Sequence, residues 1–235
     1  MRKPVPGLFV TGTDTGVGKT YVAAMIVRAL TAAGHRVGMY KPVASGCRSE
    51  GDQLVADDAT ALWQAAGSTG SFQRVCPQRF AARIAPHRAA RAEGREVDSQ
   101  LLRGGLNYWL EHSDVVVVEG AGGLMSPVTD DEFVADLAHD FGFPLVVVTR
   151  NVLGTINQTL QTVLVAGTYR GGLPVAGIVL NSGLAKTDDP SVATNRADIE
   201  RHARVGLLAE VGWQATEFTP GVDWFGFAQS LSESA

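Results

Sequence analysis

The segment from Thr11 to Thr20, with the sequence TGTDTGVGKT, constrains the fold of this chain more than any other feature. It follows a short apolar run at residues 8–10 and precedes a segment rich in Ala, Val, Ile and Leu at residues 21–33. A strand, a glycine-rich turn, a Lys-Thr pair and a helix N-terminus in this order predict a P-loop, which binds phosphate. Glycines let successive backbone N–H groups close around phosphate oxygens. We expect Lys19 to neutralise the β- and γ-phosphates and the Thr20 hydroxyl to bind Mg²⁺.

The glycine spacing of this loop differs from the strict P-loop pattern. That pattern, Gly-x4-Gly-Lys-Thr, requires glycine at position 13, but the chain has Thr13 there and its leading glycine is Gly12. A chance glycine-rich turn is the alternative, although Gly-Lys-Thr between a strand and a helix favours phosphate binding. The dinucleotide-binding pattern is absent, since Tyr21 occupies the place of its third glycine. The residues expected around the phosphates are Thr13, Asp14, Thr15, Gly16, Val17, Gly18, Lys19 and Thr20.

The composition indicates a single folded domain, residues 1–235, without an affinity for polyanions. Hydrophobic residues make up 45% of the chain and charged residues 19%, which is typical of globular proteins. The net charge of −4 argues against binding to nucleic acid or to an anionic membrane. No apolar run approaches the ~20 residues of a membrane span, and Met1–Gly7 lacks the apolar core of a signal peptide. With Cys47 and Cys76 expected to be free thiols, a cytoplasmic location is predicted.

Strand-like and helix-like segments alternate along the chain. This alternation predicts an α/β fold: one doubly wound, mostly parallel sheet with helices on both faces. Strands are expected at residues 8–10, 36–40, 114–119, 144–149, 175–180 and 205–211, with a polar loop at 47–52. Helices are expected at residues 21–33, from 57 onward, at 98–111, 130–141, 158–169 and 197–202, and after 223, with Thr155 as the cap of the helix at 158–169.

Lys41 and Glu119 both stand at the predicted carboxyl end of a strand. Pro42 cannot continue a central strand, so Lys41 ends the strand before it, at the edge where an open parallel sheet binds ligands. An ordinary surface lysine is the alternative for Lys41. Glu119 follows four consecutive valines, which predict a fully buried strand. A carboxylate in that place can hold Mg²⁺, or one of its waters, across from Thr20.

Two further groups of charged residues are ambiguous in the sequence. Asp57 and Asp58 open a predicted helix, where the helix dipole favours carboxylates whether or not they bind a metal. Basic residues recur at every fourth position further along the chain, although Pro86 interrupts any helix there. We interpret them as a solvated face rather than as an anion or nucleic-acid site. They are Arg79, Arg83, His87, Arg91 and Arg95.

Three blocks of sequence together resemble the dethiobiotin synthetase family: residues 11–20, residues 40–46 (YKPVASG) and residues 118–123 (VEGAGG). The Gly-x5-Gly-Lys-Thr spacing is also that family's form of the P-loop. The resemblance covers roughly residues 8–183 and implies a P-loop NTPase fold and a homodimeric, ATP-dependent ligase of biotin biosynthesis. It implies that 7,8-diaminononanoate, CO₂ and MgATP give dethiobiotin, ADP and phosphate through a carbamate and a carbamic-phosphoric anhydride.

The resemblance also implies roles for individual residues. Lys19, Lys41 and Ser45 would be the catalytic residues. The two lysines would stabilise the negative charge of the carbamate and of the transferring phosphoryl group. The site would lie at the dimer interface, with Asn157 in the partner-facing wall near the substrate. Mg²⁺ would be bound by Thr20, Asp58 and Glu119. ATP would be contacted by Glu119 and by Asn181, which would lie at the adenine edge. The diamine would be contacted by Ser45, Gly122 and Gly123.

A switch ATPase of the partitioning or septum-site type is the alternative function. Those proteins carry an additional lysine early in the P-loop, where this chain has Thr13 and Asp14. The resemblance to dethiobiotin synthetases fades beyond Asn181, so the sequence does not predict selectivity for the nucleotide base. Arg150 lies outside the shared pattern, and we expect it to pair with the carboxylate of the substrate.

Overall fold

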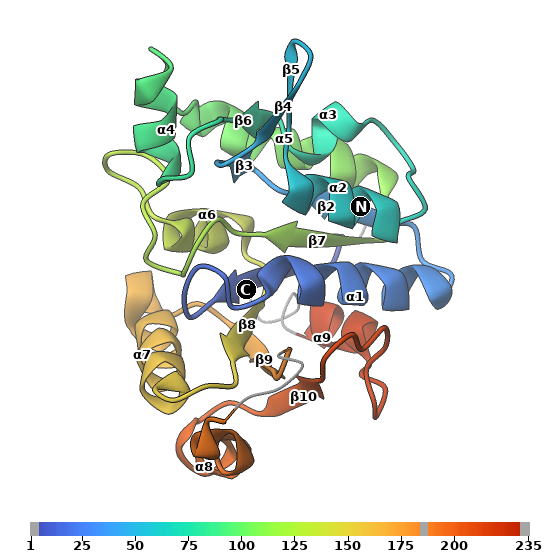
Figure 1. Ribbon diagram of the computed structural model, residues 1–235. Coiled ribbons are helices and arrows are strands. Elements are labelled where there is room, and N and C mark those ends of the chain that lie inside the picture. The colour runs from blue at the N-terminus through green and yellow to red at the C-terminus, as the bar shows by residue number, and fades with distance from the viewer. Residues whose placement is uncertain (1–4, 184–187, 231–235) are drawn as a thin grey trace.

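A parallel sheet forms the centre of the computed structural model (Figure 1). Among residues 5–183 and 188–230, which the structure describes, six strands form this sheet in the order β10-β9-β8-β1-β7-β2, and every pairing is parallel. The prediction that residues 1–7 do not form a signal peptide falls partly on residues 1–4, which lie outside the described residues. The strands of the sheet are β1 (Gly7–Gly12), β2 (Val37–Tyr40), β7 (Val115–Glu119), β8 (Leu145–Arg150), β9 (Val175–Asn181) and β10 (Leu207–Val211).

Strand β1 lies inside the sheet and carries the P-loop at its carboxyl end. All its residues are buried, and it pairs with β7 on one side and with β8 on the other. The valines of β7, residues 115–118, are 0% exposed, as expected for an apolar strand covered on both faces. Strands β7 and β2 continue the sheet on one side of β1, and β8, β9 and β10 continue it on the other. This arrangement confirms the predicted doubly wound α/β fold.

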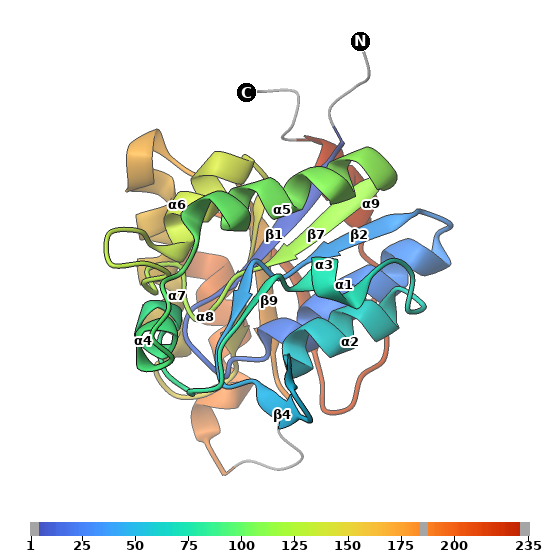
Figure 2. The same cartoon turned by 90° about the horizontal axis from the view of Figure 1, so that it is seen from above.

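Helices cover both faces of the sheet. Figure 2 shows α5 and α6 on one side of β1 and β7, and α1 and α2 on the other. The helices are α1 (Lys19–Ala32), α2 (Asp57–Ala65), α3 (Phe72–Val75), α4 (Pro86–Ala92), α5 (Ser99–His112), α6 (Val134–Phe141), α7 (Thr155–Thr168), α8 (Asn195–His202) and α9 (Trp224–Ser230). Short 3₁₀ turns occupy η1 (Tyr169–Gly171) and η2 (Pro190–Ala193).

Two small sheets lie outside the central one. Strands β3 (Val43–Ala44) and β6 (Gln78–Arg79) pair in parallel, and β4 (Arg48–Glu50) and β5 (Gln53–Val55) form an antiparallel pair. The β4–β5 hairpin corrects the prediction of a polar loop at 47–52. Its first strand is exposed along its whole length, so it lacks the alternation of apolar residues by which a half-buried strand is recognised.

Two predicted helix starts are also wrong. Helix α6 begins only at Val134, because the acidic residues before it belong to a turn in which Val128 N donates to Glu132 O at 2.8 Å. Thr155 is not a cap but the first residue of α7, and Gly154 stands at the cap position in a left-handed conformation that suits glycine.

Two further features are the state of the cysteines and the length of the helices. Cys47 and Cys76 are buried free thiols, which confirms that prediction. In the part of the chain that the structure describes, each helix is too short or too polar to cross a membrane.

Candidate active site

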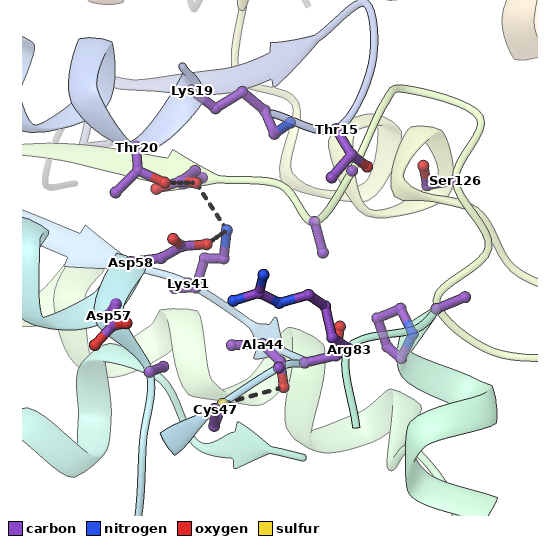
Figure 3. Close-up of a pocket in the computed structure, with 18 of the residues that line it drawn as sticks. Thr15, Lys19, Thr20, Lys41, Ala44, Cys47, Asp57, Asp58, Arg83 and Ser126 are labelled. Atoms are coloured by element: carbon purple, nitrogen blue, oxygen red, sulfur yellow. Dashed lines mark hydrogen bonds and ion pairs between the residues drawn. The ribbon is translucent and has the colours of Figure 1, made fainter. Parts of the chain in front are cut away.

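A cleft of about 610 Å³ opens at the carboxyl ends of β1, β2 and β7 (Figure 3). The P-loop and the start of α1 form one wall, and the segments that follow β3 and β6 form the opposite wall. An open parallel sheet binds its ligands at this edge. The polar and charged side chains that line the cleft are Thr15, Lys19, Thr20, Lys41, Ser45, Cys47, Asp57, Asp58, Arg83, Glu119 and Ser126.

The P-loop is held in shape by a glycine at the helix start and by two hydrogen bonds. Gly18 precedes α1 with φ of +97°, and a Cβ at this position would collide with the amide of Asn181. That amide donates to Val17 O at 2.8 Å, which ties β9 to the loop. Lys19 Nζ donates to Asp14 O at 2.8 Å, so its ammonium lies over the loop backbone. Backbone N–H groups, a helix N-terminus and a cation therefore meet in one place, which suits a phosphate group.

Lys41 lies deep in the cleft, where it contacts two carboxylates. Its Nζ lies 2.8 Å from Glu119 Oε1 and 2.9 Å from Asp58 Oδ2, and it donates to Gly120 O at 3.1 Å. Its backbone is fixed as well, since Lys41 N donates to Val75 O at 2.7 Å. Lys41 is 2% exposed, which excludes the interpretation as an ordinary surface lysine.

Burial and neighbouring charges set the protonation states in the cleft. Burial by itself would lower the pKa of Lys41, but the carboxylates of Glu119 and Asp58 outweigh it and raise this pKa. Burial raises the pKa of Glu119, whereas Lys41 lowers that of Asp58. Burial, together with repulsion from Lys41, lowers the pKa of Lys19 to about 8. Lys41 is therefore a permanent cation, while the charge of Lys19 depends on pH.

Oxygen atoms of Thr20, Asp58 and Glu119 provide the donor set for a metal ion. Thr20 Oγ1 donates to Glu119 Oε1 at 2.8 Å, while Glu119 Oε2 is buried and has no hydrogen-bond partner among the described residues. Mg²⁺ typically takes one or two carboxylates from the protein and its other ligands from phosphates and water. Within residues 5–183 and 188–230, no three His, Cys, Asp or Glu side chains form a metal-binding cluster. These residues therefore fit Mg²⁺ held jointly with a nucleotide, rather than by the protein alone.

Comparison with known proteins assigns this chain to a family. A family model described as an AAA domain matches residues 6–217. The ATP-dependent dethiobiotin synthetase BioD of Anaeromyxobacter dehalogenans is 48% identical over 209 residues, which cover 88% of this chain and 90% of that protein. The chain belongs to the dethiobiotin synthetase family. A second dethiobiotin synthetase, from Rhodopirellula baltica, is 42% identical over 214 residues, which cover 86% of this chain and 82% of that protein.

The fold extends beyond the dethiobiotin synthetase family. The crystal structure of a ParA family ATPase from Chlorobium tepidum matches with a TM-score of 0.54 at 12% identity, over 91% of this chain and 86% of that chain. Likeness at this level of identity shows the fold alone, because one fold hosts many functions. It confirms the predicted P-loop NTPase architecture and carries no argument for the alternative switch function.

Several residues that dethiobiotin synthetase family membership implies do line the cleft. Ser45 and Gly122 lie on its walls, and Gly123 follows in the same turn, where its N–H donates to Ser126 Oγ at 2.8 Å. Of the two candidate aspartates, Asp58 faces Lys41, whereas Asp57 forms an ion pair with Arg48 at 2.9 Å. The ambiguity left by the sequence is therefore resolved in favour of Asp58 as the carboxylate beside the lysine.

Besides Gly123 and the P-loop residues Thr13, Asp14 and Val17, three predicted residues do not line the cleft of this dethiobiotin synthetase family member: Asn181, Asn157 and Arg150. Asn181 stands beside the P-loop, and its side-chain oxygen accepts from Gly183 N at 3.1 Å. Asn157 lies on α7 and accepts from Gln161 at 3.2 Å. Arg150 is exposed at the end of β8. Their contacts with adenine and with the substrate stay predictions.

Cys47, Arg83 and Ser126 line the cleft but are absent from the predicted site. The stripe that contains Arg83 is not a helix face, because Arg79 ends β6 and α4 starts only at Pro86. The loop between these elements folds against the segment after β3, where Gly46 N donates to Ala82 O at 2.9 Å. This contact depends on long-range pairing, so the fourfold spacing of basic residues gives no sign of it.

Proposed function

We propose that this protein is an ATP-dependent dethiobiotin synthetase, which converts 7,8-diaminononanoate, CO₂ and ATP to dethiobiotin, ADP and phosphate in biotin biosynthesis. The observation that carries the proposal is the position of Lys41, which is buried against Glu119 and Asp58 in the cleft that the P-loop borders. The relatives named for this activity match the chain over 86–88% of its length.

Each step of the proposed reaction forms or consumes an anion. An amine of the substrate attacks the carbon of CO₂, an N–C bond forms and a proton is lost, which leaves a carbamate. A carbamate oxygen then attacks the γ-phosphorus, the bond to ADP breaks, and a carbamic-phosphoric anhydride results. The second amine attacks the carbonyl carbon of this anhydride, phosphate leaves with the bonding electron pair, and loss of a proton completes the ureido ring.

Lys41 and Lys19 supply positive charge for these steps. Two carboxylates and Gly120 O fix the ammonium of Lys41, so no reorganisation is needed when negative charge develops in front of it. Lys19 extends from the start of α1 toward the β- and γ-phosphates, and phosphate favours its charged form. Thr20, Asp58 and Glu119 hold Mg²⁺, which neutralises phosphate charge when it is bound.

The diamine binds against Ser45, Gly122 and Gly123 in this proposal, with Ser45 beside the reacting amine. Asn157 reaches the substrate of a second subunit, so the working form is a homodimer. Support for this part comes from two apolar side chains near Asn157, Leu153 and Leu164, which are 80% and 67% exposed.

Two further assignments complete the proposal. Asn181 binds the adenine edge, since its amide already lies against the P-loop. The protein acts in the cytoplasm, where thiols such as the buried Cys47 and Cys76 stay reduced.

Phosphate release tests the proposed activity. MgATP and bicarbonate are incubated with and without 7,8-diaminononanoate, and dethiobiotin is followed by mass spectrometry. Phosphate and dethiobiotin should appear in equal amounts and only with the diamine, and Lys19→Ala should abolish both. Slow hydrolysis that ignores the diamine would contradict the proposal and favour the switch ATPase.

A further inference from the structure

The wall of the cleft opposite the P-loop contributes an arginine to which the proposed reaction gives no role. Arg83 lies between β6 and α4 and lines the cleft together with Lys19, Lys41 and Glu119. Figure 3 shows its side chain extending into the cleft toward Lys41. Its guanidinium forms no hydrogen bond or ion pair with any residue that the structure describes.

The other arginines of the same basic stripe have partners elsewhere on the protein. Arg91 pairs with Asp130, Arg95 pairs with Glu93 at 3.3 Å, and Arg79 donates to Leu54 O at 2.9 Å. None of these three lines the cleft. Arg83 therefore differs from these three arginines in the direction of its side chain, and it has no partner among residues 5–183 and 188–230.

The base of the Arg83 side chain is positioned, although its head group is not. The backbone on its N-terminal side is held by the hydrogen bond from Gly46 N to Ala82 O, 2.9 Å long. A Cβ added to Gly46 would lie 3.3 Å from both Cβ and Cγ of Arg83, so the stem of the arginine passes close over this glycine. The segment after β3 thus directs the side chain into the cleft.

The carboxylates that line the cleft already pair with other cations: Asp58 and Glu119 pair with Lys41, and Asp57 pairs with Arg48. Asp58 and Glu119 both contact Lys41, and neither lies within ion-pair distance of Arg83. The planar guanidinium carries donors in a fixed fork that matches a carboxylate group. Since no carboxylate of the described residues pairs with Arg83, its guanidinium is available to an anionic ligand.

We infer that Arg83 binds the carbamate group of the substrate and is a further catalytic residue, an inference that rests on the proposed function. The carbamate is the planar, carboxylate-type anion formed in the cleft, when an amine joins CO₂ and releases a proton. A guanidinium directed toward Lys41 meets this end of the substrate rather than its distant carboxylate. A nearby cation also favours the unprotonated amine, which is the form that attacks CO₂.

Binding of the diamine with and without CO₂ tests this inference. Calorimetric titrations of 7,8-diaminononanoate use protein, Mg²⁺ and a non-hydrolysable ATP analogue, first in CO₂-depleted buffer and then with bicarbonate. Without CO₂, Arg83→Ala should bind the diamine with the affinity of the wild type. With bicarbonate, its affinity for the diamine should fall about 10- to 100-fold. In the phosphate-release assay with ATP, its kcat should fall by a similar factor. Arg83→Lys should retain part of the effect, because it keeps the charge and loses the fork.

Arg88→Ala is the matched control. It removes the same charge from an exposed position on α4 that does not line the cleft, and it should match the wild type in every measurement. Equal weakening by Arg83→Ala with and without bicarbonate would overturn the inference, because Arg83 would then bind the carboxylate of the diamine. Wild-type kcat in Arg83→Ala would also overturn it. A wild-type protein that makes no dethiobiotin would instead refute the proposed function.

Discussion

Replacing Lys41 with methionine should destabilise the protein by about 3–5 kcal/mol at neutral pH, because it removes the cation between two carboxylates. The side chain of Glu119 is 0% exposed, whereas that of Asp58 is 45% exposed. Water can therefore solvate Asp58 in the variant but cannot reach Glu119. The cost falls mainly on Glu119, which becomes a buried carboxylate without a counter-ion. Such a loss is a large part of the ~5–15 kcal/mol by which domains are stable.

The loss of stability caused by Lys41→Met should depend on pH, because it depends on the protonation state of Glu119. Burial already raises the pKa of Glu119 in the folded state, and Lys41 is the largest influence that lowers it. Without Lys41 this pKa rises further, so the folded protein holds a proton that the unfolded chain releases. Stability then falls as pH rises through this range, and the deficit relative to wild type should be smaller at about pH 5 than at about pH 8.

Urea unfolding followed by circular dichroism at both pH values measures these differences. The double variant Lys41→Met/Glu119→Gln removes both charges and should recover most of the loss. Arg36→Met is the control: it breaks an exposed pair with Asp114, 2.6 Å long, and should cost less than about 1 kcal/mol. Equal unfolding midpoints for wild type and Lys41→Met, or no recovery in the double variant, would refute the reasoning.

Three further predictions concern the P-loop. Affinity for ATP should fall as pH rises through about 8, where free Lys19 loses its proton, and a flat titration between about pH 7 and pH 9 would contradict this. Gly18→Ala should lower the free energy of unfolding by about 2 kcal/mol, because it combines a positive φ with a collision against Asn181. Gly34 has a φ of +91° and open space around an added Cβ, so Gly34→Ala should lower the free energy of unfolding by about 1 kcal/mol. Equal losses in Gly18→Ala and Gly34→Ala would show that the collision with Asn181 is unimportant. Thr20→Val should abolish the Mg²⁺ dependence of ATP binding while leaving Mg²⁺-free binding unchanged, as measured by titration calorimetry, and an undiminished response to Mg²⁺ would exclude Thr20 as a ligand.

The phosphate side of the cleft could be predicted from the sequence because local features create it. The P-loop is one continuous segment whose strand, glycines and helix start all act within it. Lys41 and Glu119 could be placed together although they are far apart in sequence, since each ends an apolar strand and parallel strands end at the same edge. One general property of sheets was enough to join them.

The opposite side of the cleft could not be predicted in the same way. Asp57 and Asp58 are equivalent as helix-start residues, and only the position of α2 decides which of them faces Lys41. Arg83 enters the cleft because β3 and β6, each two residues long, pair across a long stretch of chain. A pair of such short strands leaves no periodic pattern in the sequence.

The two walls of the cleft are therefore held by different β-sheets. One rests on the central sheet, whereas the segments that carry Ser45 and Arg83 are joined by the small β3–β6 sheet. Substitutions in this second wall can reshape the space offered to the substrate without moving the strands that position the phosphates. In evolutionary terms, we expect the wall that carries Ser45 and Arg83 to be able to change while the strands that hold the P-loop are kept.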